Sequence, residues 1–129
     1  MIIKGKNKMK IDEIQKLIDD TDYWDMRILG MNASFFGDNI ELIIENDEES
    51  SWKISFLSCY KVSYETDADR RKIDHVSEMT RSQLGYYGQD ITVSESDTEG
   101  FYKIELDLSI MLMQIECKEI KTEKIKNIK

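Results

Sequence analysis

The chain has 129 residues, 40% hydrophobic and 34% charged, which suits one globular domain with its own core and excludes a disordered chain. Its net charge of −8 is uneven: residues 1–10 carry +4 and residues 121–129 carry +3, so residues 11–120 carry −15. Such an acidic body argues against a nucleic-acid partner, which requires a concentrated basic surface, and fits either a basic protein partner or simple solubility.

The first third of the chain predicts one helix and two strands. In KIDEIQKLIDD the apolar residues fall on one face, which predicts an amphipathic helix near residues 10–20. MRILGMNASFF (26–36) and IELIIE (40–45) predict strands, and GDN (37–39) has the residue types of a tight turn. The second strand should therefore be the partner of the first.

Residues 51–65 show the most regular alternation in the chain. Every second residue is apolar or aromatic apart from Ser58, which predicts a long strand with one face in the core. The tyrosines at its far end suit the rim of a core, where the ring is buried and the hydroxyl is hydrated. The residues predicted to share this face are Trp52, Ile54, Phe56, Tyr60, Val62 and Tyr64.

A second helix is predicted after this strand, near residues 68–84. TDAD begins with Thr66 and places Asp69 three residues on, which is the pattern of a capping box. A loose apolar stripe follows, and Gly85 or Gly88 can end the helix.

The C-terminal part predicts strands again. QDITVSES (89–96) and FYKIELDL (101–108) flank a turn, and a phase slip near residues 110–113 predicts a bulge or a turn before a last strand. Residues 1–9 and 121–129, both rich in lysine, are expected to fray. The predicted fold class is therefore α+β, with a mainly antiparallel sheet or sandwich of about six strands, an N-terminal helix and one mid-chain helix.

Targeting and redox signals are weak. No apolar run approaches the roughly 18 residues of a membrane span, and the lysine-bearing N-terminus lacks the apolar segment of a signal peptide. Cys59 and Cys117 lie in strand-like runs, where a reduced, buried and inert thiol is the default. We therefore expect a single cytoplasmic domain over residues 1–129, with neither a nucleic acid nor a membrane as its partner.

The sequence offers little catalytic chemistry. His75 is the single histidine and lies in a highly charged stretch, where a surface position on a helix is expected. A metal site is suggested by the cluster of Glu65, Asp67, Asp69, Asp74 and His75, but basic residues interrupt it and the glycine of a calcium loop is missing. No phosphate-binding or dinucleotide motif is present. We therefore predict no catalytic residues, no metal and no cofactor.

Aromatic residues beside acids or glycines are the best candidates for a protein interface. DYWD sets two aromatics between two aspartates, and GYYG sets two tyrosines between glycines. Exposed Trp and Tyr surrounded by acids are typical interface anchors. In the alternative, Trp24 packs the helix against the first strand and the tyrosines fill the end of the core. The candidate interface residues are Asp22, Tyr23, Trp24, Asp25, Tyr86 and Tyr87.

The order DMRILGMN, IELIIEN, WKISF, GQDITV, YKIELD and MQIECKEI resembles small uncharacterised proteins of Gram-positive bacteria, some of which resemble immunity proteins that neutralise polymorphic toxins. The resemblance runs over residues 24–120 and implies an α+β or sandwich-like domain with no catalytic residues. The leading hypothesis is a non-enzymatic cytoplasmic protein of immunity or inhibitor type that binds a basic protein. The alternative is a small-molecule-binding or hydrolytic domain with a pocket near Tyr60, Tyr64 and His75. Homo-oligomerisation stays open under both hypotheses.

Overall fold

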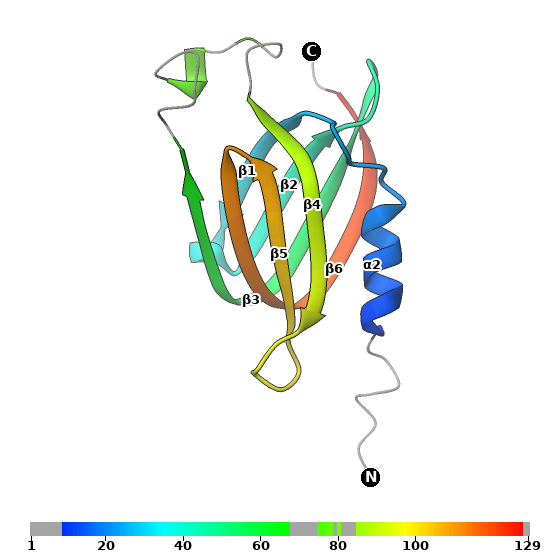
Figure 1. Ribbon diagram of the computed structural model, residues 1–129, viewed down its shortest axis with the longest axis vertical. Helices are drawn as coiled ribbons and strands as arrows, with labels where there is room; N and C mark the ends of the chain where they lie inside the picture. Colours follow the sequence, from blue (N-terminus) through cyan, green and yellow to red (C-terminus); the bar gives the residue numbers. More distant parts are fainter. Residues whose placement is uncertain (1–8, 68–74, 79, 81–84, 128–129) are drawn as a thin grey trace.

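The computed structural model describes residues 9–67, 75–78, 80 and 85–127. The elements are α2 (Ile11–Asp19), β1 (Ile28–Ser34), β2 (Asn39–Glu45), β3 (Ser50–Thr66), β4 (Tyr86–Glu95), β5 (Tyr102–Ser109) and β6 (Met111–Lys126), with 3-10 turns at Phe35–Gly37 and Val76–Glu78. The strands form one antiparallel sheet in the order β1-β2-β3-β6-β5-β4, and α2 lies beside β4 (Figure 1). The predicted α+β class and N-terminal helix are confirmed, and the strands make one open sheet, not a sandwich.

Helix α2 packs one apolar stripe against the sheet. The Glu13 side chain accepts a hydrogen bond from the Lys10 backbone N–H at 2.8 Å, which stabilises the first turn. Ile14 and Ile18 lie on the opposite side of the helix and are almost fully buried. They join a hydrophobic core to which all six strands contribute.

Side chains close the outer edge of β4. The Gln15 amide accepts a hydrogen bond from the Val93 N–H and donates one to the Ile91 carbonyl, both at 2.8 Å. The Tyr23 hydroxyl accepts a hydrogen bond from the Ile91 N–H, also at 2.8 Å. These two side chains satisfy backbone groups that a neighbouring strand would otherwise satisfy.

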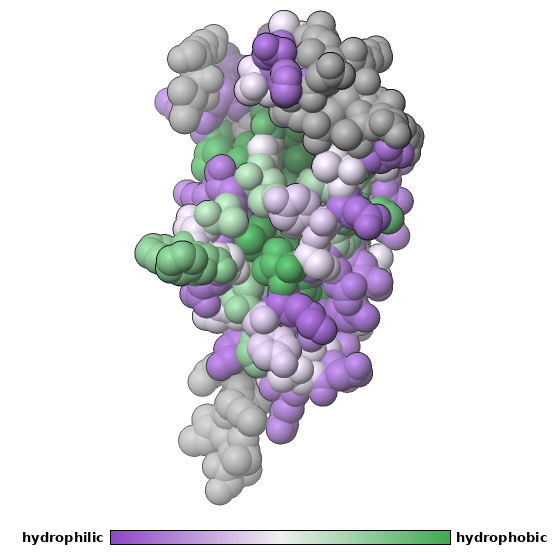
Figure 2. Space-filling model, turned by 90° about the vertical axis from the view of Figure 1, so that its left-hand side faces the viewer, coloured by the Kyte–Doolittle hydropathy of each residue, from purple (hydrophilic) through white to green (hydrophobic). Residues whose placement is uncertain are grey.

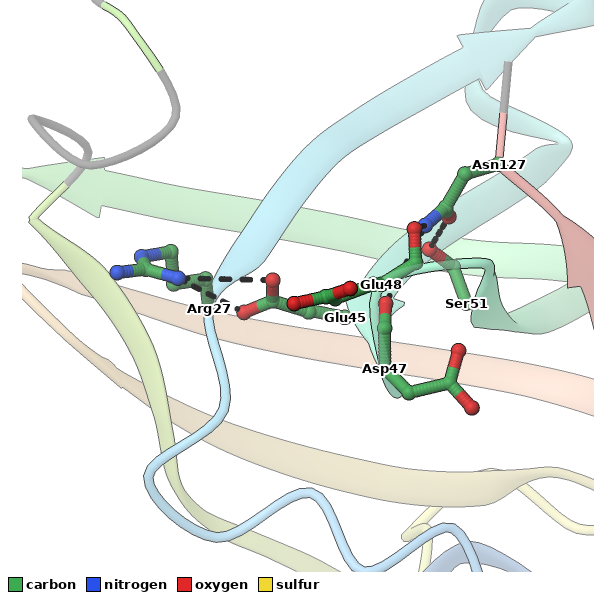
Figure 3. Close-up of polar contacts among 6 residues, drawn as sticks. All are labelled: Arg27, Glu45, Asp47, Glu48, Ser51 and Asn127. Atoms are coloured by element: carbon green, nitrogen blue, oxygen red, sulfur yellow. Dashed lines mark hydrogen bonds and ion pairs between the residues drawn. The ribbon is translucent and has the colours of Figure 1, made fainter. Parts of the chain in front are cut away.

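The chain before β1 ties the two ends of the sheet together. It makes isolated bridges to β4, between Trp24 and Gly88 and between Arg27 and Tyr87. Arg27 also forms an ion pair with Glu45 of β2, with Nη1 3.1 Å from Oε1 (Figure 3). The sheet therefore curls around its core, which brings β4 towards β1 (Figure 1).

Strand β3 keeps the predicted alternation only over its first half. Ile54 and Phe56 are fully buried, as expected. Ser58 then takes a φ of 55°, and the register with β6 shifts just after it, so the strand contains a bulge. Beyond the bulge, β3 is no longer paired with β2. The predicted burial of Tyr60 and Tyr64 is therefore wrong: they are 61% and 57% exposed.

The lysine-rich C-terminus belongs to the sheet, and its expected fraying over residues 121–129 is wrong for the described part. Strand β6 runs to Lys126 and stays paired with β3 to that point. Asn127 then donates hydrogen bonds from Nδ2 to the carbonyl oxygens of Asp47 at 3.3 Å and Glu48 at 3.1 Å, and its Oδ1 accepts one from the Ser51 hydroxyl (Figure 3). Backbone pairing does not depend on side-chain charge, so the lysines are no obstacle to it.

The predicted mid-chain helix near residues 68–84 lies mostly outside the described residues. Of that span the structure describes residues 75–78 and 80, and Val76–Glu78 form a 3-10 turn. Strand β4 begins at Tyr86, three residues before the predicted strand. In the part of the chain that the structure describes, we find no helix with the length and apolar character needed to cross a bilayer.

Candidate protein-binding surfaces

Two of the six candidate interface residues are part of the core. Tyr23 is fully buried, and its hydroxyl is bound to β4 as described above. Tyr86 is also buried, and its hydroxyl lies 2.7 Å from the Thr66 hydroxyl in a hydrogen bond. Neither ring can contact a partner directly in this conformation, so both occupy the core positions that the alternative predicted for tyrosines.

Burial also sets the acidity of Tyr23. Desolvation raises the pKa of its hydroxyl to about 12, although the hydrogen bond with Ile91 acts in the opposite direction. The carboxylates of Asp19 and Asp90 raise the pKa further, because they disfavour a second negative charge nearby. The hydroxyl is thus neutral at physiological pH and serves as a structural hydrogen-bonding group.

The other four candidates form a patch that the fold assembles from two distant segments. Trp24 is 43% exposed and stacks on Tyr23, with ring centroids 4.2 Å apart. It bridges to Gly88, next to the half-buried Tyr87, while Asp22 and Asp25 beside it are exposed. We call the four residues the tryptophan patch: Asp22, Trp24, Asp25 and Tyr87.

A glycine makes the approach of these two segments possible. The Asp25 N–H donates to the Gly88 carbonyl at 2.8 Å, and the Gly88 N–H donates to the Met26 carbonyl at 2.9 Å. A Cβ placed on Gly88 would lie 2.5 Å from the carbonyl oxygen of Tyr23, which is too close for any side chain. The patch therefore depends on a residue type that the sequence shows but whose role only the fold reveals.

A second surface lies on the outer side of four strands, where the register aligns polar residues in two rows. One row places Glu105 of β5 opposite Gln114 of β6, and the other places Asp107 opposite Leu112. β3 extends the rows on one side and β4 on the other. We call this surface the acidic face, formed by Ser63, Gln114, Glu105 and Thr92 in the first row and by Glu65, Leu112, Asp107 and Asp90 in the second.

The carboxylates of the acidic face lie without a cationic partner in the part of the chain that the structure describes. Among the described residues, none of Glu65, Asp90, Glu105 and Asp107 forms an ion pair. Asp90 and Asp107 lie directly opposite each other on neighbouring strands, an arrangement of like charges that destabilises a sheet. Leu112, which is 57% exposed, lies between Glu65 and Asp107 in the same row. The face therefore costs stability in the free protein.

The acidic face is slightly hollowed. Its residues, together with Tyr64, Leu106 and Met113, line an open hollow of about 530 Å³. The pocket predicted near Tyr60, Tyr64 and His75 is not formed by these three residues: Tyr64 lines the hollow, but Tyr60 packs against Phe101 with ring centroids 5.3 Å apart. His75 is exposed and lies outside the lining.

The acidic cluster near the end of β3 and the two cysteines are the groups on which metal or thiol chemistry would depend. Of the acidic cluster, Asp69 and Asp74 lie outside the described residues, and within the described part no three His, Cys, Asp or Glu side chains could hold a metal ion together. Cys59 lies opposite Cys117 across β3 and β6, and both thiols are free. A hydrogen bond with Cys59 and burial raise the pKa of the Cys117 thiol, which keeps it protonated.

Sequence reasoning missed two surfaces. Part of the acidic face was visible in the sequence, because Glu105 and Asp107 alternate with the apolar residues of their strand. The full set of residues on the face follows only from the register of four strands. The second is the pair Phe35 and Phe36, which the sequence placed inside a strand and which instead forms the exposed turn between β1 and β2.

These features define a small α+β protein whose most distinctive surface is an uncompensated acidic sheet face. Comparison with known families then identifies its relatives: the sequence model of the family "Immunity protein PIM7" matches residues 10–124, and the chain belongs to this family. The resemblance to immunity proteins predicted from the sequence is thus confirmed at the level of the family. No curated protein matches the chain.

A solved structure shares the fold. An uncharacterized protein from Neisseria gonorrhoeae superimposes with a TM-score of 0.53 at 14% sequence identity, and the match covers 78% of this chain and 92% of that one. At this level of identity the likeness concerns the arrangement of the helix and strands alone.

Proposed function

We propose that this protein binds and neutralises a toxin without chemistry of its own, and that the acidic face receives a basic surface of that toxin. Membership in the PIM7 family over residues 10–124 carries the proposal, since an immunity protein implies a cognate toxin and is typically non-enzymatic. The net charge of −15 on residues 11–120 supports a basic partner. We also propose a cytoplasmic location, which two free cysteines fit.

The acidic face has the features of a surface made for binding. Opposed carboxylates on neighbouring strands repel each other in the free protein, and a lysine or arginine from a partner would relieve that repulsion. Leu112, which is 57% exposed, offers apolar contact area among the charges. Carboxylates of this kind mainly raise the association rate and orient the partner, while apolar anchors slow dissociation.

The tryptophan patch adjoins the acidic face along β4. Trp24 bridges to Gly88, and Asp90 of the acidic face lies two residues further along the same strand. We therefore propose that the patch extends the contact, with the half-exposed indole of Trp24 as an anchor beside the carboxylates of Asp22 and Asp25.

The small-molecule-binding alternative finds less support. The hollow is open and lined largely by acidic and polar side chains, whereas ligand pockets are enclosed and mostly apolar. Two of the three residues predicted to form its pocket, Tyr60 and His75, lie outside the lining.

The test compares two neutralised variants that change the charge equally. Glu105→Gln with Asp107→Asn removes two charges from the acidic face, and Glu48→Gln with Glu49→Gln removes two from an exposed turn elsewhere. The probe is the product of the adjacent gene, tested as the cognate toxin and purified with any toxic activity disabled by mutation. We expect the first variant to associate about tenfold more slowly, with a shallower salt dependence, and the control to change little. Equal effects of both variants on the association rate would show that the net charge of the protein, and not the acidic face, governs association. If wild type and both variants all failed to bind, the proposed function would be refuted.

A further inference from the structure

The turn between β1 and β2 exposes two adjacent phenylalanines. Phe35 is 75% exposed and Phe36 is fully exposed, so they are the most exposed large hydrophobic residues in the described part of the chain. Figure 2 shows hydrophobic side chains that project clear of this side of the molecule. Removing such side chains from water would be favourable, and the folded chain does not do so.

The backbone of this turn is strained. Phe35 and Phe36 have φ values of 54° and 60°, in the left-handed region that residues with bulky side chains avoid. The next residue, Gly37, also has a positive φ, of 92°. A glycine or asparagine at either phenylalanine position would relieve the strain. The backbone conformation therefore does not explain why aromatic residues occupy these positions. Exposure and strain are both unfavourable in the free protein, and they affect the same two residues.

The turn is also fixed to the sheet. The Asp38 N–H donates to the Phe35 carbonyl at 3.1 Å, and the Asp38 carbonyl accepts from the Cys59 N–H of β3 at 2.9 Å. Strand pairing continues up to the turn, with Ser34 opposite Asn39. The two rings are therefore held outward by a rigid scaffold, which limits the entropy lost when a partner binds them.

The negative charge of the protein indicates which kind of partner would bind these two rings. The protein has a net charge of −8, and the exposed Asp38 adjoins the turn. A second copy of the chain or an anionic lipid surface would be repelled. A basic protein would be attracted, and the family to which the chain belongs implies a toxin as partner.

We propose that the Phe35–Phe36 turn is an apolar anchor that enters a hydrophobic pocket with a basic rim on the toxin, with Asp38 beside that rim. The proposal rests on the proposed function and adds to it the part of the contact that slows dissociation. Aromatic anchors in desolvated pockets typically lose about 30-fold in affinity or more when they are truncated, which corresponds to about 2 kcal/mol.

The test replaces the rings without disturbing the turn. Phe35→Asn with Phe36→Asn removes both rings, and asparagine tolerates the left-handed conformation. Binding to the disabled toxin domain of the adjacent gene should weaken at least 100-fold, chiefly through faster dissociation, while the unfolding midpoint stays equal or rises. Phe36→Leu, which keeps an apolar side chain, should lose far less affinity. The acidic-face variant described above should differ by slowing association instead.

The possible outcomes separate the two proposals. If wild type binds the toxin domain and the double asparagine variant binds equally well, the anchor is refuted and the proposed function stands. If the double variant is destabilised, Phe35→Gly with Phe36→Gly repeats the test with a backbone still freer to adopt the turn. Binding of wild type but not of the variant to vesicles containing anionic lipid would refute the protein anchor in favour of a membrane contact. If wild type does not bind the toxin domain, both proposals fail.

Discussion

Replacing Tyr23 by phenylalanine tests whether side chains hold the edge of β4. The hydroxyl accepts a hydrogen bond from the Ile91 N–H at 2.8 Å and lies 3.4 Å from the Ile91 carbonyl, so the first contact is much the stronger. The substitution removes one oxygen and leaves the buried ring and its stacking on Trp24 in place. Any loss of stability therefore reports on the hydrogen bond.

The expected loss follows from the burial of the site. Tyr23 is fully buried, so water cannot easily replace its hydroxyl, and the Ile91 N–H would be left without a partner. A buried donor that loses its acceptor costs about 1–3 kcal/mol. We expect Tyr23→Phe to lower the free energy of unfolding by an amount in this range.

The same residue predicts a dependence on pH. The pKa of Tyr23 is about 12 in the folded protein and about 10 in a model peptide, so on raising the pH the unfolded chain loses this proton first. The stability that the neutral hydroxyl contributes is therefore complete below pH 10 and is lost as the pH rises from 10 through 12. The stability gap between wild type and Tyr23→Phe should narrow over that interval.

Urea unfolding followed by tryptophan fluorescence measures both effects. Titrations at pH 7 give the difference in free energy, and a series up to pH 11 gives its trend. A difference below about 0.5 kcal/mol at pH 7, with no narrowing above pH 10, would show that β4 does not depend on the Tyr23 hydroxyl.

Three further predictions concern other parts of the structure. Gly88→Ala should lower the free energy of unfolding, measured with urea, by about 1–3 kcal/mol, because the new Cβ would meet the backbone of Tyr23. The control Gly30→Ala, whose Cβ would have no atom within 4 Å, should change it by less than about 1 kcal/mol. Phe56→Ala should cost about 3–5 kcal/mol by urea unfolding, and a loss below about 1 kcal/mol would show that its face of β3 is not core. Trp24→Ala should speed dissociation from the toxin domain and leave the association rate unchanged, as surface plasmon resonance can measure; unchanged dissociation would remove the tryptophan patch from the contact.

Local patterns in the sequence predicted those elements whose side chains alternate without interruption. The burial of Ile54 and Phe56 followed from a period of two, and the face of α2 that holds Ile14 and Ile18 followed from helical spacing. The prediction was wrong for Tyr60, because a bulge changes the phase of a strand without leaving a distinct residue signal.

Pairing between distant strands could not be predicted. The acidic face requires β3 to lie beside β6, and the β6 C-terminus is held by backbone partners about 70 residues earlier in the chain. Composition made residues 121–129 resemble a solvated tail, since nothing local reveals a partner. The core positions of Tyr23 and Tyr86 have the same origin: each hydroxyl finds its partner on another segment.

The closure of β4 by Gln15 and Tyr23 has a consequence for self-association. Both side chains come from the short N-terminal part of the chain, in or just after helix α2, which holds nine residues. If this segment detaches locally, β4 becomes an unpaired strand edge of the kind that templates intermolecular β-pairing. The rate of aggregation should then follow the free energy of detaching α2, not that of global unfolding. Changes at Gln15 could promote aggregation in a protein whose melting temperature is nearly unchanged.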